Sequence, residues 1–287
     1  MKNFSAPVPV IRPALPRDKA DVFEFTKFIW DGHDYVGYVF PEWLEDTRGQ
    51  LFVVEFAGRC IGTGKVTYLA PGQWWLEGFR IDPKFQGLRI GSKLDAACNA
   101  WWDEHGDGAL RLMTNAKRVQ VRHLSELRGF VKMGETLEFG ADALAGPVDA
   151  FTPLAPDEAG EAVSFCRDIA PGRLINLGWK FVAPNEHSLR AVAQQGLAWR
   201  WRGRSGILTA WENDEDDAPN LTVGFEACTD GDRAALLSDF RYLARARGAA
   251  VAGWSNVIGP DVPQILNAAG YQRAGDWVAY LYERFHP

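Results

Sequence analysis

The carboxylate of Glu77 and a glycine-containing loop lie close together in the sequence, in the stretch LEGFRIDPKFQGLRIGS, residues 76–92. An apolar strand should end at Asp82, and a helix should begin near Gly91 after a short loop. The first four N–H groups of a helix have no partner inside it, and the helix dipole adds positive potential beside them. Gly87 and Gly91 let the backbone approach a ligand, and Ser92 adds a hydroxyl donor. The loop therefore predicts a site for a diphosphate.

Two other interpretations of this loop stay open. A plain strand-to-helix turn would need similar glycines and would bind nothing. A dinucleotide fingerprint is disfavoured, because the loop has no GxGxxG and no strand–helix–strand unit surrounds Gly62 and Gly64.

The elements that must position the loop follow from the hydrophobic pattern. Hairpin strands come first and strand–loop–helix–strand units follow, so we expect a mixed α/β sheet of the α+β type. The first half should contain strands at 8–13, 51–57, 61–69, 74–82 and 109–114, and helices at 19–30, 91–104 and 120–128, with a short helix ending before 46.

The chain repeats itself at an offset of 140 residues. IRPALPRDKADVFEF from Ile11 aligns with FTPLAPDEAGEAVSF from Phe151, and each copy reads as a strand, a proline-marked turn and a helix. A second echo pairs RGFVKMGE around Gly129 with AGYQRAGD around Gly270. We interpret this as a duplication, with domains at residues 1–145 and 146–287; chance recurrence of short proline turns is the alternative.

Composition limits the possible partners. A net charge of −6 argues against non-specific nucleic-acid binding, and residues 1–145 are near neutral, with 18 basic and 19 acidic residues. The widely spaced Cys60, Cys98, Cys166 and Cys228 indicate reduced, buried thiols rather than a disulfide or metal site. No apolar run could span a membrane or act as a signal peptide, so we expect a soluble cytoplasmic protein.

The stretch after residue 76 resembles motif A of the GCN5-related N-acetyltransferase (GNAT) superfamily, (Q/R)-x-x-G-x-(G/A) after a strand ending in V-D-P. Asp82, Pro83, Gln86 and Gly91 match the motif, whereas Arg89 stands at its usual first glycine. Either the turn keeps a negative φ there and tolerates the side chain, or coenzyme binding is impaired; we favour tolerance, because an arginine beside a diphosphate is useful. The resemblance covers about residues 10–139 and implies acetyl-CoA as cofactor, bound by Phe79, Arg80, Ile81, Gln86, Gly87, Leu88, Arg89, Ile90, Gly91 and Ser92.

The same resemblance places the reacting thioester beside this strand, where it splays from its neighbour. Strand alternation would put Trp75, Glu77, Phe79 and Ile81 on one face, with Glu77 nearest the thioester. We predict that Glu77 is the general base, because a carboxylate partly removed from water accepts a proton from an ammonium readily; a structural salt bridge is the alternative. Where the family often has a tyrosine as general acid, this chain has Ser125, so His123, Tyr35 or water would serve instead.

The acceptor side is predicted in the aromatic and acidic stretch WDGHDYVGYVFPEWLED, residues 30–46. Acids can pair with an ammonium group and rings can cover an apolar body, although an aromatic helix pair that caps the core fits the pattern equally. With WLEGFRIDP, this stretch is similar to the histidine N-acetyltransferase-like branch of the superfamily, which implies a free amino acid such as histidine. The predicted substrate-binding residues are His33, Asp34, Tyr35 and Trp75.

The second half lacks the loop. The strand near residues 221–227 is followed by CTDGDRAALLSDF, where Asp230 or Asp232 reads as a helix N-cap that would repel a diphosphate. We therefore expect a tandem of two GNAT-like acyl-CoA N-acyltransferase domains, the second degenerate, acting as a pseudo-dimeric monomer or a homodimer. The expected activity is acetyl transfer from acetyl-CoA to a small-molecule amine, without a metal; a non-catalytic acyl-CoA-binding or interaction module is the alternative.

Overall fold

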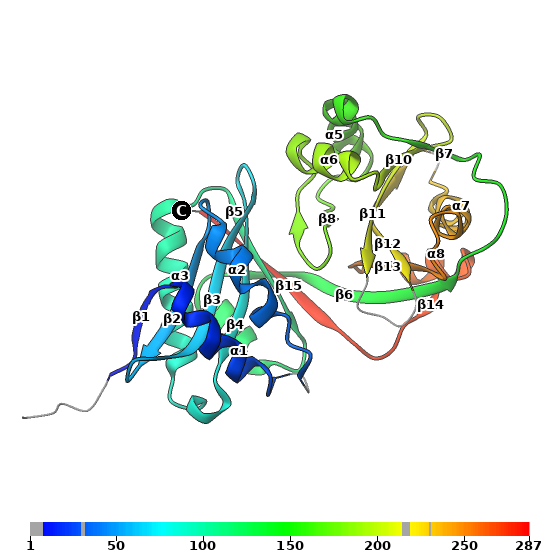
Figure 1. The fold of residues 1–287 in the computed structure, drawn as a ribbon. Helices are drawn as coiled ribbons and strands as arrows, with labels where there is room; N and C mark the ends of the chain where they lie inside the picture. The colour runs from blue at the N-terminus through cyan, green and yellow to red at the C-terminus, as the bar shows by residue number, and fades with distance from the viewer. Residues whose placement is uncertain (1–7, 30–31, 214–218, 230, 287) are drawn as a thin grey trace, which may run out of the picture. The chain divides into compact units, whose positions relative to one another are not determined.

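The computed structural model describes residues 8–29, 32–213, 219–229 and 231–286 (Figure 1). The chain divides into two compact units. The first is made of Met1–Leu112, His123–Phe130 and Arg284–Pro287, and the second of Met113–Arg122 and Val131–Glu283. The duplication into residues 1–145 and 146–287 stays a prediction.

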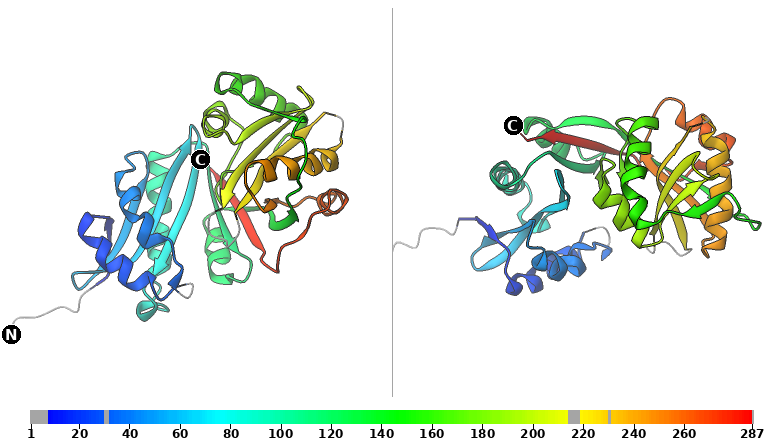
Figure 2. Two further views of the ribbon diagram at one scale, coloured as in Figure 1. Left: turned by 45° about the vertical axis from the view of Figure 1, so that its right-hand side comes forward. Right: turned by 90° about the horizontal axis from the view of Figure 1, so that it is seen from above.

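The first unit is built on a mixed sheet in the order β1-β2-β3-β4-β5. The first four strands pair antiparallel in succession, whereas β5 is parallel to β4. Helices α1 and α2 lie on one face of this sheet and α3 on the other (Figure 2). The elements are β1 (Val10–Pro13), α1 (Lys19–Thr26), α2 (Val36–Glu45), β2 (Gln50–Phe56), β3 (Arg59–Ala70), β4 (Gln73–Ile81), α3 (Ile90–His105), β5 (Ala109–Asn115) and α4 (Val119–Leu127).

The sequence pattern explains these elements. Apolar residues such as Val22, Phe25 and Phe40 on α1 and α2 pack against Leu51 and Val53 of β2 in one buried cluster. The predicted hairpin and the strand that precedes the loop correspond to β2, β3 and β4, and the predicted helices differ from α1, α3 and α4 by a few residues. The mixed α/β class is therefore confirmed.

The second unit is also built on a mixed sheet, in the order β6-β13-β12-β11-β10-β7, with β14 and β15 paired antiparallel to β6. Strands β12 and β13 are parallel. Its core includes Val223 and Trp254, which pack in one buried cluster with residues of α7 and α8. The elements are β6 (Val131–Asp142), β7 (Phe151–Pro153), α5 (Ala159–Ile169), β8 (Ile175–Asn176), β9 (Phe181–Val182), α6 (Glu186–Gln194), β10 (Ala198–Trp201), β11 (Gly206–Asn213), β12 (Asn220–Cys228), α7 (Arg233–Ala246), β13 (Val251–Val257), α8 (Val262–Ala268), β14 (Gln272–Arg273) and β15 (Ala279–Phe285).

The two copies of the sequence repeat adopt the same local structure. In each, a short strand leads to a proline-started 3-10 turn and then to a helix, α1 or α5. The carboxylate of Asp18 accepts a hydrogen bond from the Leu15 N–H at 2.8 Å, and Glu158 does the same for Ala155 at 3.0 Å. The matched prolines and acids therefore share one structural role.

The described part of the chain contains no helix both long and apolar enough to cross a membrane. Cys60, Cys98, Cys166 and Cys228 are all buried and free.

Candidate active site

The loop that joins β4 to α3 is open to solvent. Asp82 caps a 3-10 turn by accepting the Lys84 N–H at 2.9 Å, and the chain then runs through exposed residues 86–89 to the start of α3 at Ile90. Gly87 has φ +80°, and a Cβ there would meet no heavy atom within 4 Å. The loop therefore has the room that an anion needs.

The backbone donors of the loop are available. In the described part of the chain, no hydrogen bond outside α3 uses a backbone N–H of residues 86–92 as its donor. The first-turn N–H groups of α3 lie at the positive end of a 16-residue helix. The loop therefore offers several donors and a favourable potential to a diphosphate, as its sequence predicts.

Two side chains of the loop donate hydrogen bonds, and a third residue, Arg89, has an unusual backbone conformation. The Ser92 hydroxyl donates to the Arg89 carbonyl at 2.9 Å, and the Gln86 amide donates to the Ile81 carbonyl at 3.3 Å. Arg89 is the N-cap of α3 and has φ +58° and ψ +18°. The expectation of a negative φ at this arginine is therefore wrong: the turn needs the left-handed conformation, which explains why glycine is usual there, and Arg89 adopts it with backbone strain.

Strand β4 contains a β-bulge at Gly78. Its pairing with β3 slips between the pairs Thr63–Arg80 and Lys65–Glu77, and Gly78 has φ +67°. A Cβ on Gly78 would lie 2.5 Å from the ring of Trp43 on α2, so only glycine fits there.

The bulge changes which side chains share a face. A Cβ on Gly64 would meet the Phe79 ring at 3.2 Å and the Cys98 sulfur of α3 at 3.3 Å, so Phe79 faces α3. Glu77 instead lies opposite Lys65, whose ammonium binds Asp46 beside the end of α2 at 2.5 Å. The expectation that Trp75, Glu77, Phe79 and Ile81 share one face is therefore wrong, because the extra residue of the bulge inverts the alternation.

The far end of β4 leaves one edge open. The pairs with β5 cover only Gln73 to Trp75, although β4 continues to Ile81 and all of these residues are described. The Asp82 N–H donates to Ile61 of β3 at 2.9 Å, so the preceding residue, Ile81, directs its own N–H to the opposite edge. An extended amide-containing ligand could pair with that edge.

Glu77 is buried, with 9% of its surface exposed. The hydroxyl of Thr67, on the neighbouring strand β3, donates to its Oε1 atom at 2.5 Å. This bond fixes the carboxylate on the side of the sheet that α2 covers. The sequence analysis did not predict a role for Thr67. Its closeness to Glu77 follows from the register of β3 and β4, in which Lys65 pairs with Glu77 and Thr67 lies two residues further along β3.

Lys65, which is fully buried, forms an ion pair with the partly exposed Asp46 next to Glu77. Burial alone would raise the pKa of Asp46, but the hydrogen bond and charge of Lys65 outweigh it and hold that pKa below its ordinary value. The sequence offered no signal for this pair, because its members lie 19 residues apart on different elements.

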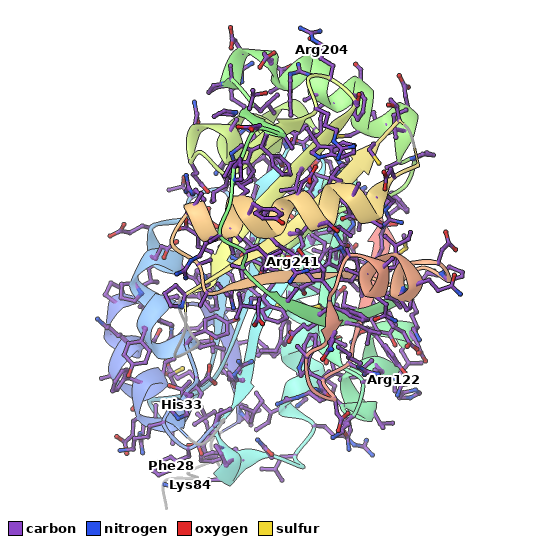
Figure 3. All side chains as sticks on the ribbon, turned by 90° about the vertical axis from the view of Figure 1, so that its right-hand side faces the viewer. Phe28, His33, Lys84, Arg122, Arg204 and Arg241 are labelled. Carbon is purple, nitrogen blue, oxygen red and sulfur yellow. The ribbon has the colours of Figure 1, made fainter. Side chains whose placement is uncertain are left out.

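The predicted acceptor stretch is organised around Asp34, whose side chain is fully buried. Arg80 of β4 binds it with two hydrogen bonds, Nε to Oδ2 at 2.5 Å and Nη2 to Oδ1 at 3.2 Å. Tyr35 is partly exposed, and its ring stands edge-on to Trp43 at 6.1 Å. Trp75 is buried, and His33 lies exposed at the surface (Figure 3). Trp30 and Asp31, in the same predicted stretch, lie outside the described residues.

Two of the residues considered for the general acid, Ser125 and His123, lie on α4. Ser125 is buried near its C-terminal end, where its carbonyl accepts the Phe130 N–H at 3.1 Å. His123 is exposed. Neither role is tested by this geometry, and both stay predictions.

In the second unit, the segment after β12 leads to a helix with an acidic N-cap. Asp232 caps α7 by accepting the Ala235 N–H at 2.9 Å, as predicted; Asp230 lies outside the described residues. On β12, fully buried Glu226 binds both Arg173, at 2.7 Å, and Arg233. Burial opposes ionisation, but the two arginines hold the pKa of Glu226 below its ordinary value. An internal carboxylate thus occupies these arginines at the end of β12.

The first unit thus combines a bulged fourth strand that leaves one edge open with an exposed turn at the start of α3, the arrangement that the resemblance to the GNAT superfamily predicts. Residues 19–130 match the model of the Acetyltransferase (GNAT) family. Residues 19–130 therefore resemble an acetyltransferase domain of the GNAT family, whose enzymes use acetyl-CoA, and the predicted resemblance, fold and cofactor are confirmed at this level.

Relatives of known name support the same class. The chain is 24% identical to histidine N-acetyltransferase of Oreochromis niloticus over 242 residues, 80% of this chain and 71% of the relative. It is 27% identical to aminoglycoside N(6')-acetyltransferase type 1 of Stenotrophomonas maltophilia over 144 residues, 47% of this chain and 94% of the relative. Among solved structures, a tandem GNAT protein from the clavulanic acid biosynthesis pathway shares the fold, with a TM-score of 0.58, 10% identity and coverage of 98% and 99% of the two chains.

Proposed function

We propose that the first half of the chain transfers an acetyl group from acetyl-CoA to the primary amine of a small molecule. The open edge of β4 beside the unpaired amides of residues 86–92 carries this proposal, because it suits a ligand with both a diphosphate and an amide-containing arm. Bound acetyl-CoA would supply an activated acetyl thioester. Gln86, Gly87, Leu88, Arg89, Ile90, Gly91 and Ser92 would hold the diphosphate, and Phe79, Arg80 and Ile81 the arm.

Glu77 is the proposed general base. The amine must lose a proton before it can attack, and Glu77 is a buried carboxylate on the strand next to the loop. The hydrogen bond from Thr67 to Oε1 orients the carboxylate, which would accept the proton directly or through one water. A backbone N–H at the open edge of β4 would stabilise the developing oxyanion.

The acceptor amine would approach from the face of the sheet that carries α1 and α2. Glu77 lies on that face, and so do Tyr35 and Trp75. Asp34 is already bound to Arg80, so we assign it the role of fixing the segment before α2 against β4. A free amino acid such as histidine is the proposed acceptor, in line with the predicted branch and with one named relative.

The second half, residues 146–287, is proposed to be a degenerate copy that does not bind the coenzyme. Its loop has the N-cap Asp232, whose negative charge disfavours a diphosphate, and its strand end is filled by the Glu226 cluster.

The first test is an assay of the free thiol released from acetyl-CoA with a panel of amines that includes histidine, other amino acids and an aminoglycoside. The second is a calorimetric measurement of acetyl-CoA binding. We expect thiol release that requires one class of amine. The Glu77→Gln variant should bind acetyl-CoA normally and lose about 100-fold or more in kcat, whereas Glu104→Gln, an exposed carboxylate on α3, should behave as wild type.

The outcomes separate the alternatives. Binding of acetyl-CoA without thiol release for any amine would favour a non-catalytic binding module. Full turnover by Glu77→Gln would remove the proposed base while leaving the activity standing. Absence of coenzyme binding would reject both functions.

A further inference from the structure

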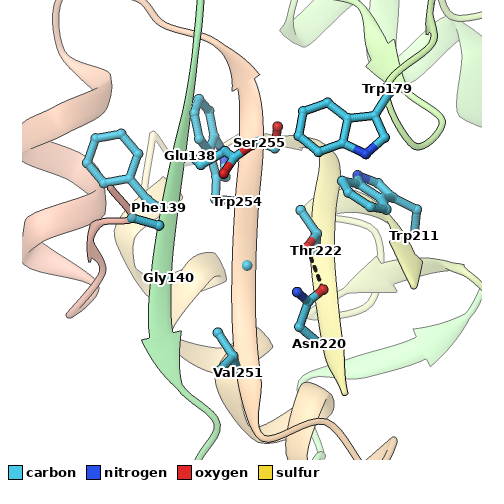
Figure 4. A pocket seen from close by; sticks show the side chains of 12 residues that line it. Glu138, Phe139, Gly140, Trp179, Trp211, Asn220, Thr222, Val251, Trp254 and Ser255 are labelled. Carbon is cyan, nitrogen blue, oxygen red and sulfur yellow. Dashed lines mark hydrogen bonds between the residues drawn. The ribbon is translucent and has the colours of Figure 1, made fainter. Parts of the chain in front are cut away.

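A cavity of about 270 Å³ lies within the second unit (Figure 4). Strands β6, β13 and β12 form its floor, and indole rings from β11 and from the loop between β8 and β9 form its wall. Its volume suits a small molecule.

The floor of the cavity exists because two glycines face each other. Gly253 of β13 lies directly opposite Gly140 of β6, and on its other side it pairs with Thr222 of β12. A Cβ on Gly253 would lie 2.3 Å from the Thr222 hydroxyl. The two glycines therefore contribute no side chains of their own to the floor, where the Thr222 hydroxyl lies beside Gly253.

The wall of the cavity contains a strained tryptophan. Gly178 and Trp179 both have positive φ, +79° and +67°, and the Leu177 N–H donates to the Lys180 carbonyl at 2.7 Å across them. These are features of a type I′ turn, in which Asn and Gly are the favoured residues and a bulky side chain is strained. A strained residue in such a turn points to a function for its side chain.

The ring of Trp179 is held in place by two other tryptophans. It lies 5.7 Å from the ring of Trp211 and 5.2 Å, edge to face, from that of Trp277. The indole N–H of Trp211 is buried and has no acceptor in the described part of the chain. An oxygen atom of a ligand could satisfy it, and buried donors are rarely left without such a partner.

The lining of the cavity includes an acidic residue. Of the residues that line it, Glu138 alone carries a formal charge, and it lies opposite Ser255 on the neighbouring strand. Tryptophan faces attract cations, and a carboxylate at the same cavity adds to that preference.

From these observations we infer that the cavity is a second ligand site, which binds a small organic ammonium ion that has an apolar body and an oxygen acceptor. The rings of Trp179 and Trp211 would contact the cationic group, and Glu138 would balance its charge. This inference does not depend on the proposed acetyl transfer.

The test is calorimetric titration of the full chain with choline and tetramethylammonium, and with 3,3-dimethylbutan-1-ol, an uncharged molecule of the same shape as choline. We expect choline to bind with a dissociation constant of about 1 mM or tighter, and the uncharged alcohol about tenfold more weakly. Trp179→Asn places a favoured residue in the turn, so this variant should keep or raise its Tm while losing about tenfold in choline affinity.

Two matched charge variants complete the test. Glu138→Gln should weaken choline binding about fivefold, whereas Glu212→Gln, which removes an exposed carboxylate of β11 outside the cavity, should leave it unchanged. The inference is overturned if neither cation binds saturably, if the uncharged alcohol binds as well as choline, or if Trp179→Asn and Glu138→Gln leave the affinity unchanged.

Discussion

Glu77 and Phe79 are two residues apart on β4 but face opposite sides of the sheet, Glu77 toward α2 and Phe79 toward α3. The bulge at Gly78 between them causes this separation. It puts the proposed base on the acceptor face while the phenyl ring packs under the helix that follows the coenzyme loop. The chemistry proposed for the site therefore depends on a glycine that bears no functional group.

Replacing Gly78 by alanine should destabilise the protein strongly. The new Cβ would have a positive φ and would overlap the Trp43 ring, so we expect a loss of about 3 kcal/mol in the free energy of unfolding, measured by urea denaturation. Gly87→Ala is the control, because its φ is also positive but its surroundings are empty; it should lose only about 1 kcal/mol. Equal losses in the two variants would mean that the Trp43 contact is unimportant.

Replacing Arg89 by glycine should change protein stability and acetyl-CoA affinity in opposite directions. Glycine relieves the left-handed strain, so the free energy of unfolding should rise by about 0.5–1 kcal/mol. Loss of the guanidinium should weaken acetyl-CoA binding about fivefold, with less dependence on salt. Arg89→Lys keeps both charge and strain and should resemble wild type in both measurements. Tighter coenzyme binding by Arg89→Gly would show that the arginine obstructs the site.

The buried pair of Asp34 and Arg80 should behave as one unit. Asp34→Asn leaves the largely buried Arg80 without its ionic partner, and Arg80→Gln does the same to the fully buried Asp34. Each variant should therefore lose about 3–5 kcal/mol in the free energy of unfolding. The double variant should cost clearly less than the two single losses added together. Additive losses in this cycle would contradict the assigned role of Asp34.

The ion pairs of Glu226 with Arg173 and Arg233 should make the free energy of unfolding of the second unit depend on pH in the acidic range. Because the folded pKa of Glu226 lies below its ordinary value of 4.5, its contribution is present above that value and is lost as the pH falls from 4.5 through the lower folded pKa. Glu226→Gln should be less stable at pH 7 and should show a flatter decline below pH 4.5, measured by denaturation at several pH values. Asp157→Asn, at an exposed site, should keep the wild-type slope.

The sequence predicted what depends on local pattern. The exposed loop between β4 and α3 follows from a strand, two glycines and a helix start within 17 residues, and the helix cap at Asp232 follows from its position before an apolar helix; that the loop binds a coenzyme stays a prediction. The face of Phe79 was predicted wrongly because strict alternation was applied across Gly78, although a glycine inside a strand is a known sign of a bulge.

Contacts between segments far apart in the chain could not be predicted from the sequence pattern. Asp34 and Arg80 lie 46 residues apart, and Arg173 and Glu226 lie 53 apart. Whether an acid in an aromatic stretch meets a ligand or an arginine depends on how the helices dock on the sheet. The aromatic cavity was missed for the same reason, because Gly140 and Gly253 come together only through the pairing of β6 with β13.

The most direct measurement of the central claim is hydrogen–deuterium exchange of the full chain with and without acetyl-CoA. The account predicts slower exchange of the amides of residues 86–92 and of Ile81 when the coenzyme is present, and unchanged exchange at residues 231–236 of the second unit. Unchanged exchange at residues 86–92 under saturating coenzyme, or protection that appears at residues 231–236 instead, would contradict it.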